Sequence, residues 1–374
     1  MSLVLHVDGA AWRAHQDSVV AGDPGIVPVA KGNGYGFGLA RLAGEVTRLG
    51  LGCLAVGTAE EVALVRGSAD EHEVRGSADE HEVRGSADEH DVRAGDAEHP
   101  GFEGDVVVLT PWRPGDAVAE AALADPGVIT TLSRLEDVAA VAKARPGARV
   151  ILEVLTSMRR YGMRPDEFEA AVAAAEGLEI VGWTIHLPMI GQHLGEATDL
   201  ATAALSAYTA PLWVSHLSAA DLDRLRQTFH VEVRHRVGTE LWLGAHDALH
   251  YRASVQDVHD VAPSERVGYW QRRAGRRHHR LAIVSGGTAN GVAMQAPTAA
   301  ANARQIAHTV ANGVMEAGRM ALSPYSAGGH KLFFAEPPHM QASLLWVPGS
   351  VRIGDELEVT MRATTATPDR IIVE

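Results

Sequence analysis

The chain has 374 residues, of which 46% are hydrophobic and 21% charged, a composition that excludes wholesale disorder. Its 33 Lys and Arg against 47 Asp and Glu give a net charge of -14, which argues against a whole-surface affinity for nucleic acid or anionic membrane. The single cysteine, Cys53, excludes an intrachain disulfide and indicates a reducing compartment. The sequence has neither a signal-peptide pattern nor an apolar run of about 20 residues, so we expect a soluble cytoplasmic protein.

Short runs rich in Val and Ile predict eight strands in the first two thirds of the chain: Ile26–Ala30, Cys53–Gly57, Asp105–Leu109, Val128–Thr131, Arg149–Leu155, Glu179–Ile185, Leu212–Ser215 and Val231–Val237. Helical stretches separate them at 39–49, 117–124, 133–144, 165–176 and 219–227, with Ser133 as an expected helix cap. Eight βα units in about 240 residues predict a (β/α)8 barrel. A doubly wound sheet is the alternative.

A nine-residue repeat, RGSADEHEV, interrupts this pattern between residues 66 and 99. Four Arg and eleven Asp or Glu give it a net charge of -7, which is half of the total for the chain. One Val per unit is too little apolar surface to form a core, so we expect an insertion in an exposed loop. An alternative is metal binding by the four histidines of the repeat, His72, His81, His90 and His99.

After Gly244 the pattern changes to strand-like segments separated by Gly and Pro, at 281–285, 331–335, 342–347 and 356–361. We therefore expect two domains. The first is the barrel, residues 1–246, with the acidic insertion at about 66–100. The second is a mostly β C-terminal domain, residues 247–374.

Reactive residues follow the predicted barrel strands, where catalytic groups of such barrels gather. They are Lys31, Arg160, His186, Ser215, Ser218, Arg236, Gly238 and Thr239. Cations, hydroxyls and glycines at one mouth suit an anionic cofactor or substrate. Lys31 ends an apolar strand and precedes four glycines, so we expect a partly desolvated amine with a lowered pKa that can form a Schiff base. A surface lysine before a flexible loop is the alternative.

The segment around Lys31, VPVAKGNGYGFGLARLA, resembles the signature of the alanine racemase family, in which the lysine carries pyridoxal 5′-phosphate (PLP). Further segments resemble that family in the same order: LTSMRRYGM, GWTIHL, VSHLSAADL, RHRVGTELWLG, VGYWQRR, and HMQASLLWVPGS with GDELEV. The similarity covers nearly the whole chain except the acidic repeat.

The resemblance implies a PLP-dependent amino-acid racemase in which two acid/base residues serve opposite faces of the substrate Cα. These are Lys31 and Tyr269, the tyrosine coming from the partner subunit of a homodimer. His186 and Arg236 supply the cationic neighbours that the phenol needs, and Arg236 faces the pyridine nitrogen. The remaining implied roles are phosphate binding by Tyr35, Ser218, Gly238 and Thr239, contact with the cofactor and the substrate carboxylate by Arg160, and substrate contact by Met340.

The chain also departs from the family pattern. Glu153 stands where a carbamylated lysine is usual, and its carboxylate can replace the carbamate charge. Thr288, His339 and Gln341 change the substrate pocket, and no tyrosine follows Tyr325 to bind phosphate. We therefore expect the substrate to be alanine or a larger amino acid.

Three other functions stay open from the sequence. A PLP-dependent decarboxylase or lyase would place a carboxylate, rather than Arg236, against the ring nitrogen. A PLP-carrying protein with little turnover would lack the two-sided acid/base pair. Nucleic-acid binding would use the basic run at 271–280, against the overall acidity of the chain.

Overall fold

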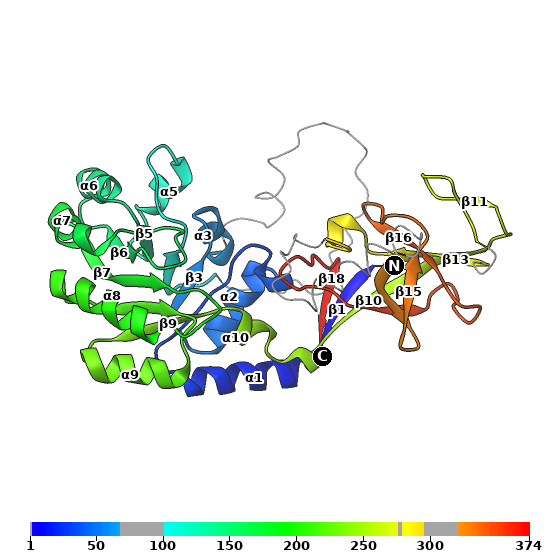
Figure 1. The fold of residues 1–374 in the computed structure, drawn as a ribbon, viewed down its shortest axis with the longest axis horizontal. Coiled ribbons are helices and arrows are strands. Elements are labelled where there is room, and N and C mark those ends of the chain that lie inside the picture. The colour runs from blue at the N-terminus through cyan, green and yellow to red at the C-terminus, as the bar shows by residue number, and fades with distance from the viewer. Residues whose placement is uncertain (1, 68–100, 276–278, 295–320) are drawn as a thin grey trace. The chain divides into compact units, whose positions relative to one another are not determined.

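The computed structural model describes residues 2–67, 101–275, 279–294 and 321–374 (Figure 1). The four histidines of the acidic repeat and part of the basic run, residues 276–278, lie outside these residues. The described chain divides into two compact units, one formed by residues 14–67 and 101–244, and one by residues 2–13, 245–275, 279–294 and 321–374.

The first unit is a parallel barrel of eight strands: β2 (Ile26–Pro28), β3 (Cys53–Val56), β4 (Asp105–Val108), β5 (Val128–Leu132), β6 (Arg149–Val154), β7 (Glu179–His186), β8 (Leu212–Ser215) and β9 (Val233–Val237). The sheet order is β2-β9-β8-β7-β6-β5-β4-β3. A parallel bridge between Val29 and Ala55 joins its two ends, and the Ala30 N–H donates to the Ala55 carbonyl at 2.8 Å. The predicted (β/α)8 barrel is therefore confirmed.

Helices follow the barrel strands: α2 (Leu39–Arg48), α3 (Glu60–Val65), α5 (Ala117–Ala122), α6 (Leu135–Ala144), α7 (Phe168–Ala174), α8 (Leu194–Ala207), α9 (Ala219–Phe229) and α10 (Thr239–Leu243). Figure 1 shows α5 to α9 along the outside of the strands. The expected cap at Ser133 is wrong, because α6 starts one residue later, with Arg134 at its N-cap. Ser133 is instead buried and accepts a hydrogen bond from the Arg113 guanidinium at 3.0 Å.

Alternating strand residues build two apolar layers. Residues such as Leu152, Trp183 and Val214 face the helices, and all three are fully buried. The opposite faces fill the barrel interior with a smaller cluster: Val27, Val29, Ala55, Val107, Ile129, Ile151 and Trp213. This alternation explains why short Val- and Ile-rich runs, buried on both faces, identified the strands in the sequence.

The second unit contains an eight-stranded sheet: β1 (Leu3–Val7), β10 (Leu249–Asp260), β13 (Arg280–Ser285), β14 (Leu322–Ala327), β15 (His330–Phe334), β16 (Ala342–Trp346), β17 (Glu356–Val359) and β18 (Arg370–Val373). Its order is β13-β16-β15-β14-β17-β10-β1-β18, and β13 also pairs with β10. All pairs are antiparallel except β1 with β18. Helix α1 (Gly9–Gly22) follows β1, with residues 9–13 in this unit and 14–22 in the first, and a small hairpin of β11 (Arg266–Val267) and β12 (Arg272–Arg273) completes the unit.

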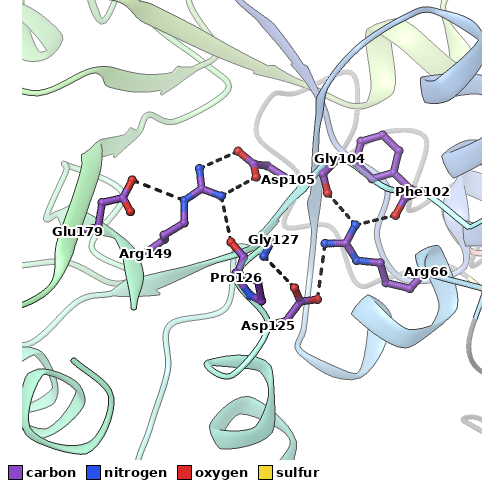
Figure 2. A network of polar contacts seen from close by, with 9 residues as sticks. All are labelled: Arg66, Phe102, Gly104, Asp105, Asp125, Pro126, Gly127, Arg149 and Glu179. Atoms are coloured by element: carbon purple, nitrogen blue, oxygen red, sulfur yellow. Dashed lines mark hydrogen bonds and ion pairs between the residues drawn. The ribbon is translucent and has the colours of Figure 1, made fainter. Parts of the chain in front are cut away.

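Ion pairs join the amino-terminal ends of the barrel strands (Figure 2). The Arg149 guanidinium, at the start of β6, donates to both carboxylate oxygens of Asp105 at the start of β4, at 2.5 and 2.8 Å. It also donates to the Pro126 carbonyl at 3.3 Å and lies 3.7 Å from the Glu179 carboxylate. Arg149 is thus a bridge between three strand starts, and groups at this end of such a barrel serve stability.

We expect Arg149→Met to lower the free energy of unfolding by about 1–3 kcal/mol, because it leaves the half-buried Asp105 carboxylate without its bidentate partner. Urea denaturation measures this. The matched control is Arg164→Met, which removes the exposed pair with Asp166 and should lower the free energy of unfolding far less than Arg149→Met. Equal effects of the two substitutions would contradict a stabilising role for Arg149.

Candidate active site

The carboxyl ends of the barrel strands bring together most of the residues singled out in the sequence. Lys31 follows β2, His186 ends β7, and Arg236 lies near the end of β9. Arg160 lies in the loop after β6, Ser218 caps α9, and Gly238 with Thr239 begins α10. Parallel strands that close a barrel end at the same rim, so these groups share one mouth.

Positive charge dominates this rim. Lys31 is accessible to solvent, yet the atoms packed around its amine, and then the charges of Arg160 and Arg236, lower its pKa. The Glu61 carboxylate acts in the opposite direction and raises this pKa. The local surroundings thus lower the pKa of this amine, as the sequence predicted. At neutral pH a larger fraction of the amine is uncharged, and therefore nucleophilic, than in an ordinary lysine.

His186 serves as an acceptor. Its Nδ1 lies 2.6 Å from the Ser215 hydroxyl and 3.4 Å from an Arg236 Nη. Because the guanidinium only donates, Nδ1 carries no proton and the neutral ring is protonated on Nε2. Burial, followed by the charges of Arg236 and Arg160, lowers the pKa of His186 to about 2. The expectation that His186 is a cationic neighbour is therefore wrong, since burial beside two arginines keeps its ring neutral.

Arg236 and Glu153 are buried barrel residues whose charges act on each other. Both are buried, with 9% and 4% of their surface exposed. Arg236 Nε and one Glu153 carboxylate oxygen have no hydrogen-bond partner among the described residues. Burial lowers the pKa of Arg236 to about 10 and raises that of Glu153 to about 7, while the charges of Arg236, Arg160 and Arg113 hold the carboxyl pKa down. The guanidinium stays charged at neutral pH, and the carboxyl titrates there.

Tyr35 and Gly238 form a close contact beside the rim. A Cβ at position 238 would lie 2.1 Å from the Tyr35 hydroxyl, so only glycine leaves room for that side chain. Tyr35 has a φ of 55°, a left-handed conformation that is strained for tyrosine. Burial, and then Glu61, raise the pKa of Tyr35 to about 12, which keeps its hydroxyl a hydrogen-bond donor.

Ser218 has the same capping position that phosphate-binding helices offer, but its hydroxyl already has partners. It accepts from the Asp221 N–H at 3.2 Å and donates to the Asp221 carboxylate at 2.7 Å. Any anion at the start of α9 would therefore share this hydroxyl with Asp221.

Glu61 is a residue that the sequence analysis missed. Its carboxylate accepts hydrogen bonds from the N–H groups of Gly32 at 2.7 Å, Gly57 at 2.6 Å and Thr58 at 3.4 Å. These donors lie in the loops after β2 and β3: Gly32 directly follows Lys31, and a Cβ at Gly57 would lie 3.1 Å from Lys31 Cβ. Glu61 thus ties two rim loops together. Its position in the first turn of the helix after β3 was the one available signal.

His216 was also missed. It lies in the loop after β8, with a left-handed φ of 60°, and its ring centroid is 5.3 Å from that of His186. Burial, and then the charge of Arg236, lower its pKa. The strained backbone and the contact with His186 place this ring among the rim residues.

Tyr269 and Met340 belong to the second unit, where they are 82% and 74% exposed. The substituted pocket residues lie there too: the Thr288 N–H donates to the His339 carbonyl at 2.8 Å. Tyr325 is fully buried, and its hydroxyl donates to the Gly286 carbonyl at 2.8 Å, so it belongs to the core of this unit.

The described residues contain neither a candidate metal site nor a candidate membrane-spanning helix. Within residues 2–67, 101–275, 279–294 and 321–374, no three His, Cys, Asp or Glu side chains are grouped to hold a metal ion. Over the same ranges, no helix combines the length and the hydropathy needed to cross a bilayer.

The fold and rim define a parallel (β/α)8 barrel with a lysine after its first strand, followed in the chain by an antiparallel β unit. The sequence profile described as the alanine racemase N-terminal domain matches residues 10–244, nearly two thirds of the chain. The protein therefore belongs to the alanine racemase family, whose fold is that of the fold-type III PLP enzymes. No curated protein sequence matches it significantly.

Solved structures with the same fold include alanine racemases. The enzyme from Bartonella henselae, with covalently bound pyridoxal phosphate, is 16% identical with a TM-score of 0.67, and the match covers 100% of both chains. That from the D-cycloserine producer Streptomyces lavendulae is 21% identical with a TM-score of 0.62, covering 97% of this chain and 88% of the other. That from Clostridium difficile 630 is 14% identical with a TM-score of 0.63, covering 96% and 86%. Such identities establish the fold alone.

We expect Glu153→Gln to remove a pH dependence of stability. The pKa of Glu153 is raised in the folded protein, so its contribution is present below about pH 4.5 and is lost as the pH rises through about 7. Relative to Glu153→Gln, the wild type should lose about 3 kcal/mol of unfolding free energy across that window. Urea denaturation at a series of pH values measures the difference.

The control is Glu169→Gln, at an exposed carboxyl of α7. It should leave the pH dependence of the wild type unchanged. If the unfolding free energies of the wild type and of Glu153→Gln changed with pH in parallel, the raised pKa of the buried Glu153 carboxyl would be contradicted.

Proposed function

We propose that the protein is a PLP-dependent amino-acid racemase that moves the Cα proton of its substrate with two acid/base residues, Lys31 and Tyr269. The single observation that carries the proposal is the Lys31 amine, whose pKa is lowered at a rim crowded with cations. Family membership and the fold support it. Alanine or a larger amino acid is the substrate.

The chemistry of the rim residues fits PLP. Lys31, Arg160 and Arg236 give an excess of positive charge that suits an anionic phosphate and phenolic oxygen. The buried Arg236 Nε is a donor without a partner among the described residues. Tyr35, Ser218, Gly238 and Thr239 offer hydroxyl and backbone N–H groups for the phosphate. When bound, PLP withdraws electrons from the substrate Cα and acidifies its proton.

The barrel residues divide the remaining work. Lys31 would hold the cofactor through its amine, and the same amine would take or return the proton on one face of Cα. Arg236, a permanently charged donor, would serve the pyridine nitrogen and disfavour a proton there, which would favour proton transfer over decarboxylation. Arg160, exposed at the rim, binds the substrate carboxylate.

Tyr269 serves the opposite face of Cα. A proton must arrive from the side opposite to the one it left, or the configuration does not invert. We propose that Tyr269 acts on the barrel of a second copy of the chain in a homodimer, with Met340 beside the substrate. The exposure of both side chains is consistent with this role.

We expect Lys31→Ala to abolish the visible absorbance band of lysine-bound PLP and its reduction by borohydride. The sequence contains only three lysines, so peptide mapping of the reduced protein identifies the attachment point without ambiguity. Lys143→Ala and Lys331→Ala are the matched controls and should retain the band. A reducible cofactor bond in Lys31→Ala would overturn the proposal.

We expect Tyr269→Phe to stop inversion but to retain hydrogen exchange at Cα. The two enantiomers have equal free energies, so inversion must fall in both directions, by about 10²–10⁴-fold. Exchange in heavy water should persist for the one enantiomer whose proton faces Lys31. Mass spectrometry with a chiral assay separates the two effects across a panel of amino acids, and Tyr208→Phe is the control. Loss of exchange from both enantiomers would refute the two-residue scheme.

A further inference from the structure

A buried carboxylate in the second unit supports the loop that carries Tyr269. Glu336 follows β15, and its side chain has no exposed surface. Its two oxygens accept from the N–H groups of Tyr269 and Trp270, each at 3.1 Å. One of them also accepts from His339 Nε2 at 2.5 Å. A buried acidic side chain thus has three donors, all of them from residues around Tyr269.

The local backbone is adapted to this carboxylate. Residues 268–271 form the tip of the hairpin between β11 and β12, and Gly268 has a φ of 69°. A Cβ at this position would come within 2.0–2.1 Å of the Glu336 carboxyl atoms. Gln271, at a left-handed φ of 48°, closes the turn through its N–H to the Gly268 carbonyl at 3.2 Å. Only glycine therefore permits the tip to lie against Glu336.

The histidine held by Glu336 lies against the tyrosine. The His339 and Tyr269 ring centroids are 4.3 Å apart, with an angle of 34° between the planes. Since a carboxylate only accepts, His339 donates through Nε2–H, which fixes the direction of its ring. Backbone bonds fix its position, because its N–H donates to the Ala342 carbonyl at 2.9 Å and its carbonyl accepts from Thr288.

We propose that Glu336 and His339 are positioning residues for Tyr269. Glu336 holds the backbone of the tyrosine and the ring of the histidine, and that ring limits the directions open to the phenol. This inference rests on the proposed function, in which Tyr269 exchanges a proton with Cα. An exposed side chain at a hairpin tip samples many rotamers, and proton transfer requires one of them.

The test separates the backbone contacts from the ring contact. His339→Gln keeps a donor for Glu336 but removes the ring, whereas Glu336→Gln replaces the carboxylate by a neutral group of similar size. We expect both variants to lower inversion by about 10–100-fold, with exchange at the Lys31 face of Cα changed less than about twofold. His259→Gln, which alters an exposed histidine paired with Asp257 in the same unit, should match the wild type in both measurements.

A second measurement needs no turnover. In protein labelled with fluorotyrosine, the Tyr269 signal is the one lost in Tyr269→Phe, and it should move in both positioning variants but not in His259→Gln. Amide exchange over residues 267–273 should accelerate in Glu336→Gln alone. If no amino acid exchanges its Cα hydrogen with the wild type, the proposed function fails, and the fluorine signal still decides the positioning of Tyr269. An unmoved signal in Glu336→Gln, or wild-type inversion in both variants, would overturn the inference.

Discussion

Repulsion between cations at the carboxyl rim of the barrel is the constraint from which the rest of the site follows. Parallel strands closed into a barrel end at one rim, so the charges of Lys31, Arg160 and Arg236 lie close together. The pKa values of both Lys31 and Arg236 are lowered as a result of burial and of this crowding. An anion bound at the rim would relieve the repulsion, so affinity for an anion is inherent in the arrangement.

The two rims of the barrel use charge in opposite ways. At the amino-terminal rim, every charged side chain drawn in Figure 2 has a partner of opposite charge. Arg149 pairs with both Asp105 and Glu179. At the carboxyl rim, Arg236 Nε has no hydrogen-bond partner among the described residues, and the buried carboxyl of Glu153 has a pKa raised to about 7. Paired charges stabilise one end of the barrel, while unsatisfied groups at the other end are available for a ligand.

The sequence was sufficient to predict elements that depend on a local pattern of residues. It was insufficient for elements that depend on contacts between distant segments. All eight barrel strands were predicted within about two residues, because each is an apolar run buried on both faces. Strand β1 was missed, since its partners β10 and β18 lie about 250 and 370 residues along the chain. The long β10 was missed although polar and apolar residues alternate along it, as in HYRASVQDVHD, the pattern of a half-buried strand, because it contains no continuous apolar run.

The candidate site divides in the same way. Strand ends placed Lys31, His186 and Arg236 at one rim, which needs no knowledge of side-chain contacts. Glu61 was not recognised because its partners are backbone N–H groups, which leave no trace in the pattern of residue types. Glu336 lies 67 residues from Tyr269, and only the folded structure brings them together.

Both proposed acid/base residues are held by the same physical device. The carboxylate of Glu61 binds the N–H next to Lys31, and that of Glu336 binds the N–H of Tyr269 itself. A carboxylate bonded directly to the amine or the phenol would fix the proton on that group and remove it from exchange. Hydrogen bonds to the backbone N–H groups instead fix the position of the main chain that carries the side chain. They leave the reactive atom of the side chain without a bond to the carboxylate. His186 illustrates the opposite case, because direct contacts at Nδ1 confine it to one protonation state, suited to support rather than to proton transfer.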